Sequence, residues 1–411
     1  MKILVLTDSL APDNKGGAGI VAANLSTKFA NKGHQVYVIT TTQSKSQVGK
    51  KRQQGLIVYK IYSHYHPRWR HYLSLYNSQT QPEIKNIIKK IRPDVVHAHN
   101  LHFYLSYNSL KIAASFTSNV FLTAHDAMLF HYGKLVEPFL SAQKRPPTSL
   151  MINPLRQLLT YKLTYNPLRN LVIKKYLKHV RKIICISHAL EDALNQNKIT
   201  NTTVIHNGID INQWQVKTSQ IKKFTDKHQL SKSKIIFFAG RVSQAKGIWQ
   251  ALKIIKAVST IHPNTRLLIM GASSRQAKEI NKKTSQLGIT KYVKVLGWVS
   301  QNQLKQAYWA SDIVLIPSIY LDPLTNIVLE AMACKRVVVA TKFGGVSEVI
   351  SPNKTGIIIN PYQTQKAAQK ISSLLLSDKK RQQIGQKAYQ KVKKQFSLSK
   401  QASQYLRLFN Q

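Results

Sequence analysis

Two carboxylates in the segment 317–348 are spaced so that they could bind a sugar next to a phosphate. Asp322 lies in a loop after an apolar strand, and Glu330 comes eight positions later in an apolar run, Ile327–Ala333, that predicts a helix. The first turn of a helix favours an anion through its N–H groups and its dipole, and we expect Glu330 in that turn. Carboxylates accept hydrogen bonds from sugar hydroxyls. The segment therefore predicts a nucleotide-sugar pocket, although a core helix of any α/β protein could carry the same apolar pattern.

A pair of cations follows another predicted strand, Lys234–Ala239. Arg241 comes directly after Gly240, and Lys246 comes directly before Gly247. Two cations held between glycines at the end of a strand suit a diphosphate, and each charge-assisted hydrogen bond contributes about 1.5–3 kcal/mol. The pattern therefore predicts a phosphate site in the second half of the chain.

A histidine and an acid end the predicted strand Phe121–His125. Open sheets bind their ligands at the carboxyl ends of parallel strands, so His125 and Asp126 are candidates for a site. A structural His–Asp pair is the alternative. Zinc ligation by three nearby histidines is a further hypothesis, but no cysteine or carboxylate clusters with them, which favours hydrogen-bonded, partly buried rings. These three are His97, His99 and His102.

The chain opens on a strand, a glycine loop and a helix. Lys2–Thr7 predicts the strand, and the helix ends at Gly33. The loop reads G-G-A-G over residues 16–19, which does not match the glycine spacing of a nicotinamide fingerprint. Alone this loop is a weak signal, because a glycine here often serves packing only.

Together these segments resemble the retaining glycosyltransferases of family 4, which have the two-domain GT-B fold. The motifs are D-P-L-T-N-I-V-L-E-A-M-A at 322–333, G-R-V-S-Q-A-K-G at 240–247, T-A-H-D at 123–126 and V-I-H-N-G-I-D at 204–210. In the family the first acid is usually Glu, followed by Pro-Phe-Gly. Asp322 is one methylene shorter and Thr325 adds a side chain near the phosphates, which bears on the choice of donor sugar.

The resemblance implies an α/β protein with two doubly wound Rossmann-like domains and a cleft between them. The acceptor-side domain is expected at residues 1–205 and the nucleotide-sugar-binding domain at 206–392. A terminal helix within 393–411 is expected to pack back on the first domain. The length of 411 residues suits two such domains, and closure over the donor is expected.

The resemblance also implies roles for five catalytic residues. Arg241 and Lys246 neutralise the leaving diphosphate. Glu330 binds the ribose, and Asp322 binds sugar hydroxyls. His125 positions the donor sugar, and the adjacent carboxylate holds its tautomer. Further donor contacts are expected at Gly16, Gly17, Gly240, Gly297, Trp298, Thr325, Asn326, Ile327 and Val328.

These roles imply a metal-independent hexosyltransferase, with same-face attack and the leaving phosphate as base. The chain has no D-x-D motif, so no metal is expected, and the nucleotide-diphosphate-sugar donor needs no further cofactor. The expected acceptor is a glycan or a lipid-linked molecule in the synthesis of cell-envelope polysaccharide or glycolipid. The alternatives are a nucleotide-sugar epimerase or hydrolase of the same fold, or a non-catalytic basic nucleic-acid-binding protein.

The charge balance favours an anionic partner. The 61 Lys and Arg against 16 Asp and Glu give a formal charge of +45, for which composition bias is the alternative explanation. Residues 141–182 interleave leucines and cations without an acid, in two helices separated at Pro154 and Pro167. This pattern favours an anionic membrane surface over nucleic acid. Residues 60–80, rich in aromatics, histidine and arginine, fit an acceptor or membrane-interface patch, a nucleic-acid stacking surface or an ordinary surface loop.

The cysteines and the first apolar run indicate the compartment. Cys185 and Cys334 imply neither a disulfide framework nor a metal set, so a reducing cytosol is expected. The first apolar run is too short for a signal peptide and Asp8 interrupts it, and no segment approaches the length of a bilayer span. We therefore expect a cytoplasmic protein, peripheral on the inner face of the cytoplasmic membrane.

Overall fold

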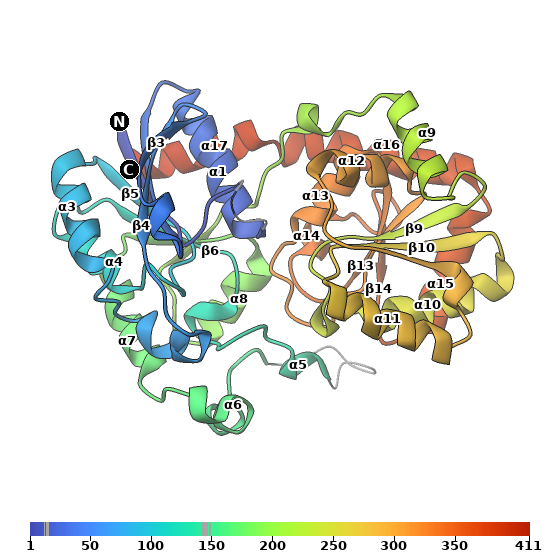
Figure 1. Ribbon diagram of the computed structural model, residues 1–411, viewed down its shortest axis with the longest axis horizontal. Helices are drawn as coiled ribbons and strands as arrows, with labels where there is room; N and C mark the ends of the chain where they lie inside the picture. The colour runs from blue at the N-terminus through green and yellow to red at the C-terminus, as the bar shows by residue number, and fades with distance from the viewer. Residues whose placement is uncertain (12, 14–15, 141–146, 148) are drawn as a thin grey trace. The chain divides into compact units, whose positions relative to one another are not determined.

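The computed structural model describes residues 1–11, 13, 16–140, 147 and 149–411 (Figure 1). The chain divides into two compact units. The first unit consists of Met1–Lys134, Ser149–Asn207 and Leu398–Gln411, and the second consists of Leu135–Thr148 and Gly208–Ser397. The expected division put residues 135–148 in the first domain and began the returning segment at 393, whereas here the stretch groups with the second unit and the return begins at 398.

Specific contacts tie the described part of residues 135–148 to the second unit. Leu321 N donates a hydrogen bond to Leu135 O at 3.0 Å. In α5 (Glu137–Leu140), the ring of Phe139 lies 4.9 Å from that of Phe343. Both contacts join residues nearly two hundred positions apart, so local sequence patterns carry no signal for them.

An eight-stranded sheet forms the centre of the first unit, in the order β3-β4-β2-β1-β5-β6-β7-β8. All neighbouring strands are parallel except β3 and β4. The strands are β1 (Lys2–Leu6), β2 (Gln35–Thr42), β3 (Gly49–Gln53), β4 (Leu56–Tyr62), β5 (Val95–Ala98), β6 (Val120–Ala124), β7 (Lys182–Cys185) and β8 (Thr202–Val204). The strands predicted at Lys2–Thr7 and Phe121–His125 are confirmed as β1 and β6. The β3–β4 hairpin was not predicted, because β3 reads G-K-K-R-Q and lacks an apolar face.

The first unit also contains helices. They are α1 (Gly17–Ala30), α2 (Arg70–Leu73), α3 (Gln81–Ile91), α4 (Asn108–Ala114), α6 (Pro154–Tyr161), α7 (Arg169–Leu177), α8 (His188–Gln196) and α17 (Leu398–Phe409). Short 3-10 helices are η1 (Lys45–Gln47), η2 (Pro67–Trp69), η3 (Ala127–Leu129) and η4 (Lys162–Thr164). The predicted pair of helices after Pro154 and Pro167 is confirmed as α6 and α7.

The helix α17 packs against α1 (Figure 1). The ring of Phe29 lies 6.4 Å from Tyr405 and 5.8 Å from Phe409. Phe409 also lies 4.9 Å from the ring of Phe121 on β6. Aromatic pairs at these distances bury large apolar surfaces, so α17 completes the core of the first unit.

A parallel six-stranded sheet, β11-β10-β9-β12-β13-β14, forms the second unit. The strands are β9 (Lys234–Phe238), β10 (Thr265–Met270), β11 (Val293–Leu296), β12 (Ile313–Ile316), β13 (Val337–Thr341) and β14 (Ile357–Ile359). The helices are α9 (Thr218–Lys227), α10 (Ile248–Ile261), α11 (Ser274–Gln286), α12 (Gln301–Ala310), α13 (Asn326–Ala333), α14 (Val346–Val349), α15 (Thr364–Leu375) and α16 (Asp378–Gln395), with η5 (Ile211–Trp214), η6 (Gln244–Lys246) and η7 (Thr290–Tyr292). The predicted strand at Lys234–Ala239 and the apolar strand predicted before Asp322 are confirmed as β9 and β12.

The parallel strands of both units lie in apolar cores. Ile3 and Val5 of β1 are buried in the first unit, and Ile236 and Val339 are buried in the second. Strands covered on both faces read as continuous apolar runs, which is why the sequence located them. Across the described residues, no helix combines the length and the apolar character that crossing a membrane would require.

Candidate active site

Three loops at the carboxyl ends of β9, β12 and β13 meet around Asp322. A Cβ added to Gly247, whose φ is 79°, would overlap the carbonyl oxygen of Pro317. A Cβ added to Gly344, whose φ is 95°, would overlap the carbonyl oxygen of Asp322. Gly345 N donates to the same Asp322 oxygen at 2.9 Å. Glycine is therefore required at both positions, because two backbones approach there at a positive φ.

Lys246 and Asp322 form a buried ion pair across these loops. The Lys246 Nζ lies 2.7 Å from Asp322 Oδ2, and the lysine side chain is only 16% exposed. Ser318 Oγ donates to the same carboxylate oxygen at 2.9 Å, and Lys246 lies over the ring of Tyr320. Burial alone would lower the pKa of Lys246, but attraction to Asp322 and Tyr320 outweighs burial and raises it. Lys246 is therefore charged at neutral pH, and its charge is matched within the second unit.

Glu330 lies in the second turn of α13, so the expectation that it belongs to the first turn is wrong. The helix begins at Asn326, one residue before the predicted start. The Glu330 Oε2 accepts a hydrogen bond at 2.7 Å from the hydroxyl of Tyr308 on α12. Burial raises the pKa of Glu330 to about 7, against a smaller opposing effect of the Tyr308 hydrogen bond. Glu330 is thus a carboxyl group that changes protonation near neutral pH.

Replacing Glu330 by Gln is expected to remove a pH-dependent cost of folding. The pKa of Glu330 is about 7 when folded against an ordinary value of 4.5, so the folded state retains a proton that the unfolded state loses. Wild-type stability therefore falls as the pH rises through this window, by up to about 3 kcal/mol. The free energy of unfolding in urea is measured for both proteins at several pH values. The difference in favour of Glu330→Gln should grow as the pH rises from acid to neutral. The control is Glu279→Gln on α11, whose side chain is 52% exposed and should not alter the pH profile. A difference between Glu330→Gln and wild type that stays constant with pH would contradict this assignment.

Arg241 and Gly240 lie beside the start of α13. A Cβ on Gly240, whose φ is 94°, would lie 2.8 Å from Ile327 Cδ1. The neighbouring Gly271, with a φ of 91°, could not carry a Cβ either, because it would lie 2.5 Å from Gly240 O. Arg241 itself is exposed. The structure thus brings the predicted cationic loop next to the predicted helix start.

The residues at the start of α13 differ in how much of their side chains is exposed. Thr325 stands at the N-cap, and in the described structure its side chain makes no capping hydrogen bond. Val328 N donates to Thr325 O at 3.3 Å, and the Val328 side chain is fully buried. Asn326 and Ile327 are partly exposed. Of these four predicted donor-binding residues, Val328 could therefore contact a ligand only through its backbone.

Gly297 and Trp298 follow the edge strand β11. Gly271 N donates to Gly297 O at 3.0 Å, and the Trp298 side chain is 51% exposed. A Cβ on Gly297 would meet only Ala272 O at an ordinary contact distance of 3.5 Å. The glycine at 297 is therefore not required by packing, and the indole of Trp298 is presented to solvent.

In the first unit, His125 pairs with His99 rather than with its neighbour. His125 Nε2 lies 2.8 Å from His99 Nδ1, and the two rings are stacked. Burial lowers the pKa of His125 to about 4, with Asp126 opposing this shift. The Asp126 carboxylate instead accepts hydrogen bonds from Met128 N at 2.9 Å and from Asn100 Nδ2 at 3.4 Å. The interpretation that Asp126 holds the tautomer of His125 is therefore wrong, and His99 occupies that position.

A chain of buried polar groups continues from His99 to α17. The rings of His97 and His99 are 4.3 Å apart. Thr123 Oγ1 lies 2.7 Å from His97 Nε2 and 2.9 Å from the Tyr405 hydroxyl. Burial lowers the pKa of His97 to about 3, so these rings are neutral. The structure thus gives His97 and His99 hydrogen-bonding roles inside the unit, and no local sequence pattern indicated the contact of Tyr405.

Asp8 is a second buried carboxyl group that the sequence did not single out as a site residue. It follows β1, and its two oxygens accept hydrogen bonds of 2.8 Å from Phe103 N and Leu105 N. Burial raises its pKa to about 7, against those two bonds and the charge of Arg70. The Arg70 Nε donates to His102 O at 3.1 Å. Asp8 therefore anchors the loop after β5 at the carboxyl edge of the sheet.

The glycine loop before α1 is partly described. Gly16 is the N-cap of α1 with a φ of −75°, and Gly17 is its exposed first residue. The glycine that packing requires is Gly19, where a Cβ would lie 2.9 Å from Ser9 O.

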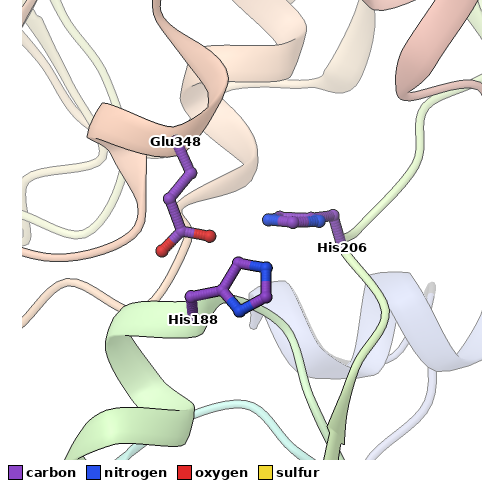
Figure 2. Close-up of side chains that lie close together, drawn as sticks. All are labelled: His188, His206 and Glu348. Atoms are coloured by element: carbon purple, nitrogen blue, oxygen red, sulfur yellow. The ribbon is translucent and has the colours of Figure 1, made fainter.

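His188 and His206 form an edge-to-face pair at the ends of β7 and β8 (Figure 2). Their ring centroids are 5.7 Å apart. His188 opens α8, whose N-cap Ser187 accepts a hydrogen bond from Leu190 N at 3.2 Å. Figure 2 also draws Glu348, which α14 carries in the second unit. The sequence singled out neither ring as a site residue.

Comparison with known proteins links both units to one family. The family described as Glycosyl transferases group 1 matches residues 220–391, and Glycosyltransferase Family 4 matches residues 15–213. An uncharacterized glycosyltransferase of Methanocaldococcus jannaschii is 25% identical over 380 residues, which are 91% of this chain and 89% of that protein. These matches extend over nearly all of the chain.

Two solved structures share the fold. HepE of Anabaena, in complex with UDP, aligns over 100% of both chains with a TM-score of 0.72 and 20% identity. Sucrose-phosphate synthase of Thermosynechococcus elongatus aligns over 100% of this chain and 98% of that chain, with a TM-score of 0.76 and 17% identity. The fold is GT-B, with one Rossmann-like sheet in each unit. The chain therefore belongs to the family 4, or group 1, glycosyltransferases.

Proposed function

We propose that this glycosyltransferase moves a hexose from a nucleotide-diphosphate-sugar to a glycan or lipid-linked acceptor, with retention of configuration, in cell-envelope polysaccharide or glycolipid synthesis. The observation that carries the proposal is the buried Lys246–Asp322 pair on the loops beside α13. A buried acid and cation, close to a helix start and an exposed arginine, match the chemistry of a sugar diphosphate. The UDP complex of the fold neighbour HepE supports a nucleotide donor.

Donor binding exchanges the partners of Lys246 and Asp322. Lys246 turns from the carboxylate to a phosphate oxygen, which is also an anion, so its charge stays matched. Asp322 then accepts hydrogen bonds from sugar hydroxyls in place of the ammonium. The paired state keeps both buried groups solvated by each other until the donor arrives.

Glu330 is the proposed ribose ligand. Its carboxyl group is already held by the Tyr308 hydroxyl at 2.7 Å, which fixes its rotamer before a ligand binds. The exposed Trp298 and the backbone at Gly297 are proposed to contact the base. These groups bind the nucleotide equally in substrate and transition state, so they contribute affinity more than rate.

The leaving diphosphate is the group that the site stabilises. Arg241, Lys246 and the first-turn backbone of α13 supply positive charge where it develops. We expect this charge to replace a metal, and the departing phosphate to act as base for same-face attack. His125, neutral because its pKa is about 4, is proposed to hydrogen-bond the donor sugar.

A donor panel tests this proposal. UDP-, GDP- and ADP-sugars are supplied with EDTA to wild type and to Glu330→Ala, beginning with the UDP-sugars. We expect turnover of one donor whose KM is strongly raised by Glu330→Ala, so that turnover at low donor concentration is lost. Glu279→Ala, an exposed control on α11, should leave this turnover unchanged. Retention is read from the anomeric proton of the product by NMR. An inhibited enzyme in EDTA would overturn metal independence, and an inverted product would overturn retention.

The same panel separates the alternatives. A hydrolase would release free sugar at an undiminished rate when acceptor is added. A protein that shows no turnover and no nucleotide-induced thermal shift would lack the donor site. For a nucleic-acid-binding protein, Arg241→Ala would instead reduce the slope of log affinity against log salt concentration by about one unit.

A further inference from the structure

The helix α6 is oriented with its polar face inward and its apolar face outward. The inward residue is Gln157, which is buried and whose Nε2 lies 2.9 Å from His131 Nε2. Asn153 caps the helix by accepting hydrogen bonds from Leu155 N and Arg156 N. Gln157 and the ring of Tyr161 therefore hold α6 on the unit, whereas Leu155, Leu158 and Leu159 are exposed and lie outside the core.

Further exposed leucines follow α6 along the chain. Leu159 is 74% exposed and Leu163 is 98% exposed. We call this set the leucine surface; it consists of Met151, Leu155, Leu158, Leu159, Leu163, Leu168 and Leu171. Isolated exposed leucines are ordinary, but this concentration of exposed apolar side chains between Met151 and Leu171 favours an interaction site. Figure 1 shows α6 at the margin of the first unit, away from its sheet.

Two aromatic residues from η2 and α2 lie beside the leucine surface. Tyr72 donates its hydroxyl to Tyr165 O at 3.0 Å. Trp69 packs edge-to-face on Tyr72 and is 49% exposed. His71, between them in sequence, packs on the ring of Tyr161, which ends α6. The aromatic stretch at 60–80 and the leucine-rich stretch at 150–171 are thus parts of one surface, although about ninety residues separate Tyr72 from Tyr165.

The charges around this surface have one sign. Arg156 and Lys162 are exposed among the leucines, and Arg68 lies over the ring of Trp69. No acid occurs in the sequence between Asp13 and Glu83 or between Glu137 and Glu191. A second copy of this surface would bring like charges together, and aliphatic side chains cannot stack on nucleic-acid bases. An anionic bilayer is complementary in both charge and polarity.

We propose that the leucine surface, with Trp69 and Tyr72, docks the first unit on an anionic lipid bilayer. The leucines enter the boundary between head groups and acyl chains, the two aromatics lie at the head-group level, and the cations bind lipid phosphate. This inference does not depend on the proposed donor or acceptor, because the surface lies outside the loops around Asp322.

Vesicle flotation tests the apolar part of the proposal. Vesicles of phosphatidylcholine mixed with phosphatidylglycerol are compared with phosphatidylcholine alone, at low and high salt. We expect Leu159→Ser/Leu163→Ser to weaken binding to the mixed vesicles about tenfold or more. Leu376→Ser, at a leucine that is 76% exposed in the second unit, is the matched control and should bind as wild type does. If the leucine variant and wild type bound equally, net charge alone would explain the binding, and the proposal would be overturned.

Charge reversal and tryptophan quenching locate the contact. Arg156→Glu/Lys162→Glu should lose binding at low salt, whereas Lys282→Glu/Lys283→Glu on α11 makes the same change in net charge and should retain it. Brominated lipids should quench wild type and Trp298→Phe, but quench Trp69→Phe much less. If quenching instead disappeared in Trp298→Phe, the membrane contact would lie at Trp298 in the second unit, and the proposal would be overturned. A wild-type dimer that Leu159→Ser/Leu163→Ser dissociates, without vesicle binding, would make a second copy the occupant.

Discussion

Alanine at Gly247 is expected to lower the free energy of unfolding by at least about 3 kcal/mol. The residue has a φ of 79°, and an added Cβ would overlap the carbonyl oxygen of Pro317. A carbonyl oxygen in a packed loop cannot move away cheaply, so either the β9 loop or the β12 loop must shift. Because Lys246 precedes this glycine, the same shift would also break its pair with Asp322. Gly247→Ala should therefore lower both the free energy of unfolding, measured in urea, and the affinity for the donor.

Two other glycines of the second unit provide matched controls for Gly247→Ala. Gly288 also has a positive φ, of 68°, but nothing lies within 4 Å of an added Cβ. Gly288→Ala should therefore cost only the backbone strain, roughly 1–2 kcal/mol. Gly297→Ala meets one ordinary contact at 3.5 Å and should be nearly neutral for folding. If Gly247→Ala cost no more than Gly288→Ala, the close approach to Pro317 would not constrain the site.

Alanine at Lys246 is expected to reduce kcat/KM by about a hundredfold to a thousandfold, as removal of a charge-stabilising donor does in other enzymes. It should also destabilise the protein by about 3 kcal/mol, because the buried Asp322, which is 2% exposed, would lose the ammonium 2.7 Å away. Steady-state kinetics and urea unfolding measure the two effects separately. Loss of kcat/KM is expected mainly in kcat, since the diphosphate gains charge as it leaves.

Two companion variants separate catalysis from folding at Lys246. Lys246→Met/Asp322→Asn removes both charges and keeps an acceptor for Ser318, so it should recover most of the stability but none of the activity. Arg241→Ala changes an exposed residue and should lower activity without altering stability. If the double variant recovered activity as well, Lys246 would serve the fold alone.

The sequence located the elements of the site because each one is a local pattern. The strands before Gly240 and Asp322 are buried on both faces, so they appear as short apolar runs. The helix that carries Glu330 follows such a run, and its start was predicted to within one residue. The one-residue difference matters, because it moves Glu330 out of the first turn.

The partners of the site residues could not be predicted in the same way. Tyr308 lies 22 positions before Glu330, and Lys246 lies 76 positions before Asp322. Such pairs form only when helices or loops that follow different strands meet in the folded unit, and no spacing rule links them. For His125, the partner expected from the sequence was its neighbour Asp126. The structure instead places His99, which follows the adjacent strand β5, within hydrogen-bond distance of His125.

The packing of α17 on α1 sets an order for folding during synthesis. Domains commonly fold as they emerge from the ribosome, beginning with the N-terminal one. Here Phe29 and Phe121 are covered by Phe409, which is translated only after the whole second unit. The unit that is made first is therefore the last to be finished, and until then its nascent form exposes an aromatic face. A chain interrupted before Leu398 would carry a complete second unit beside an uncovered first one, which makes that face a target for chaperones.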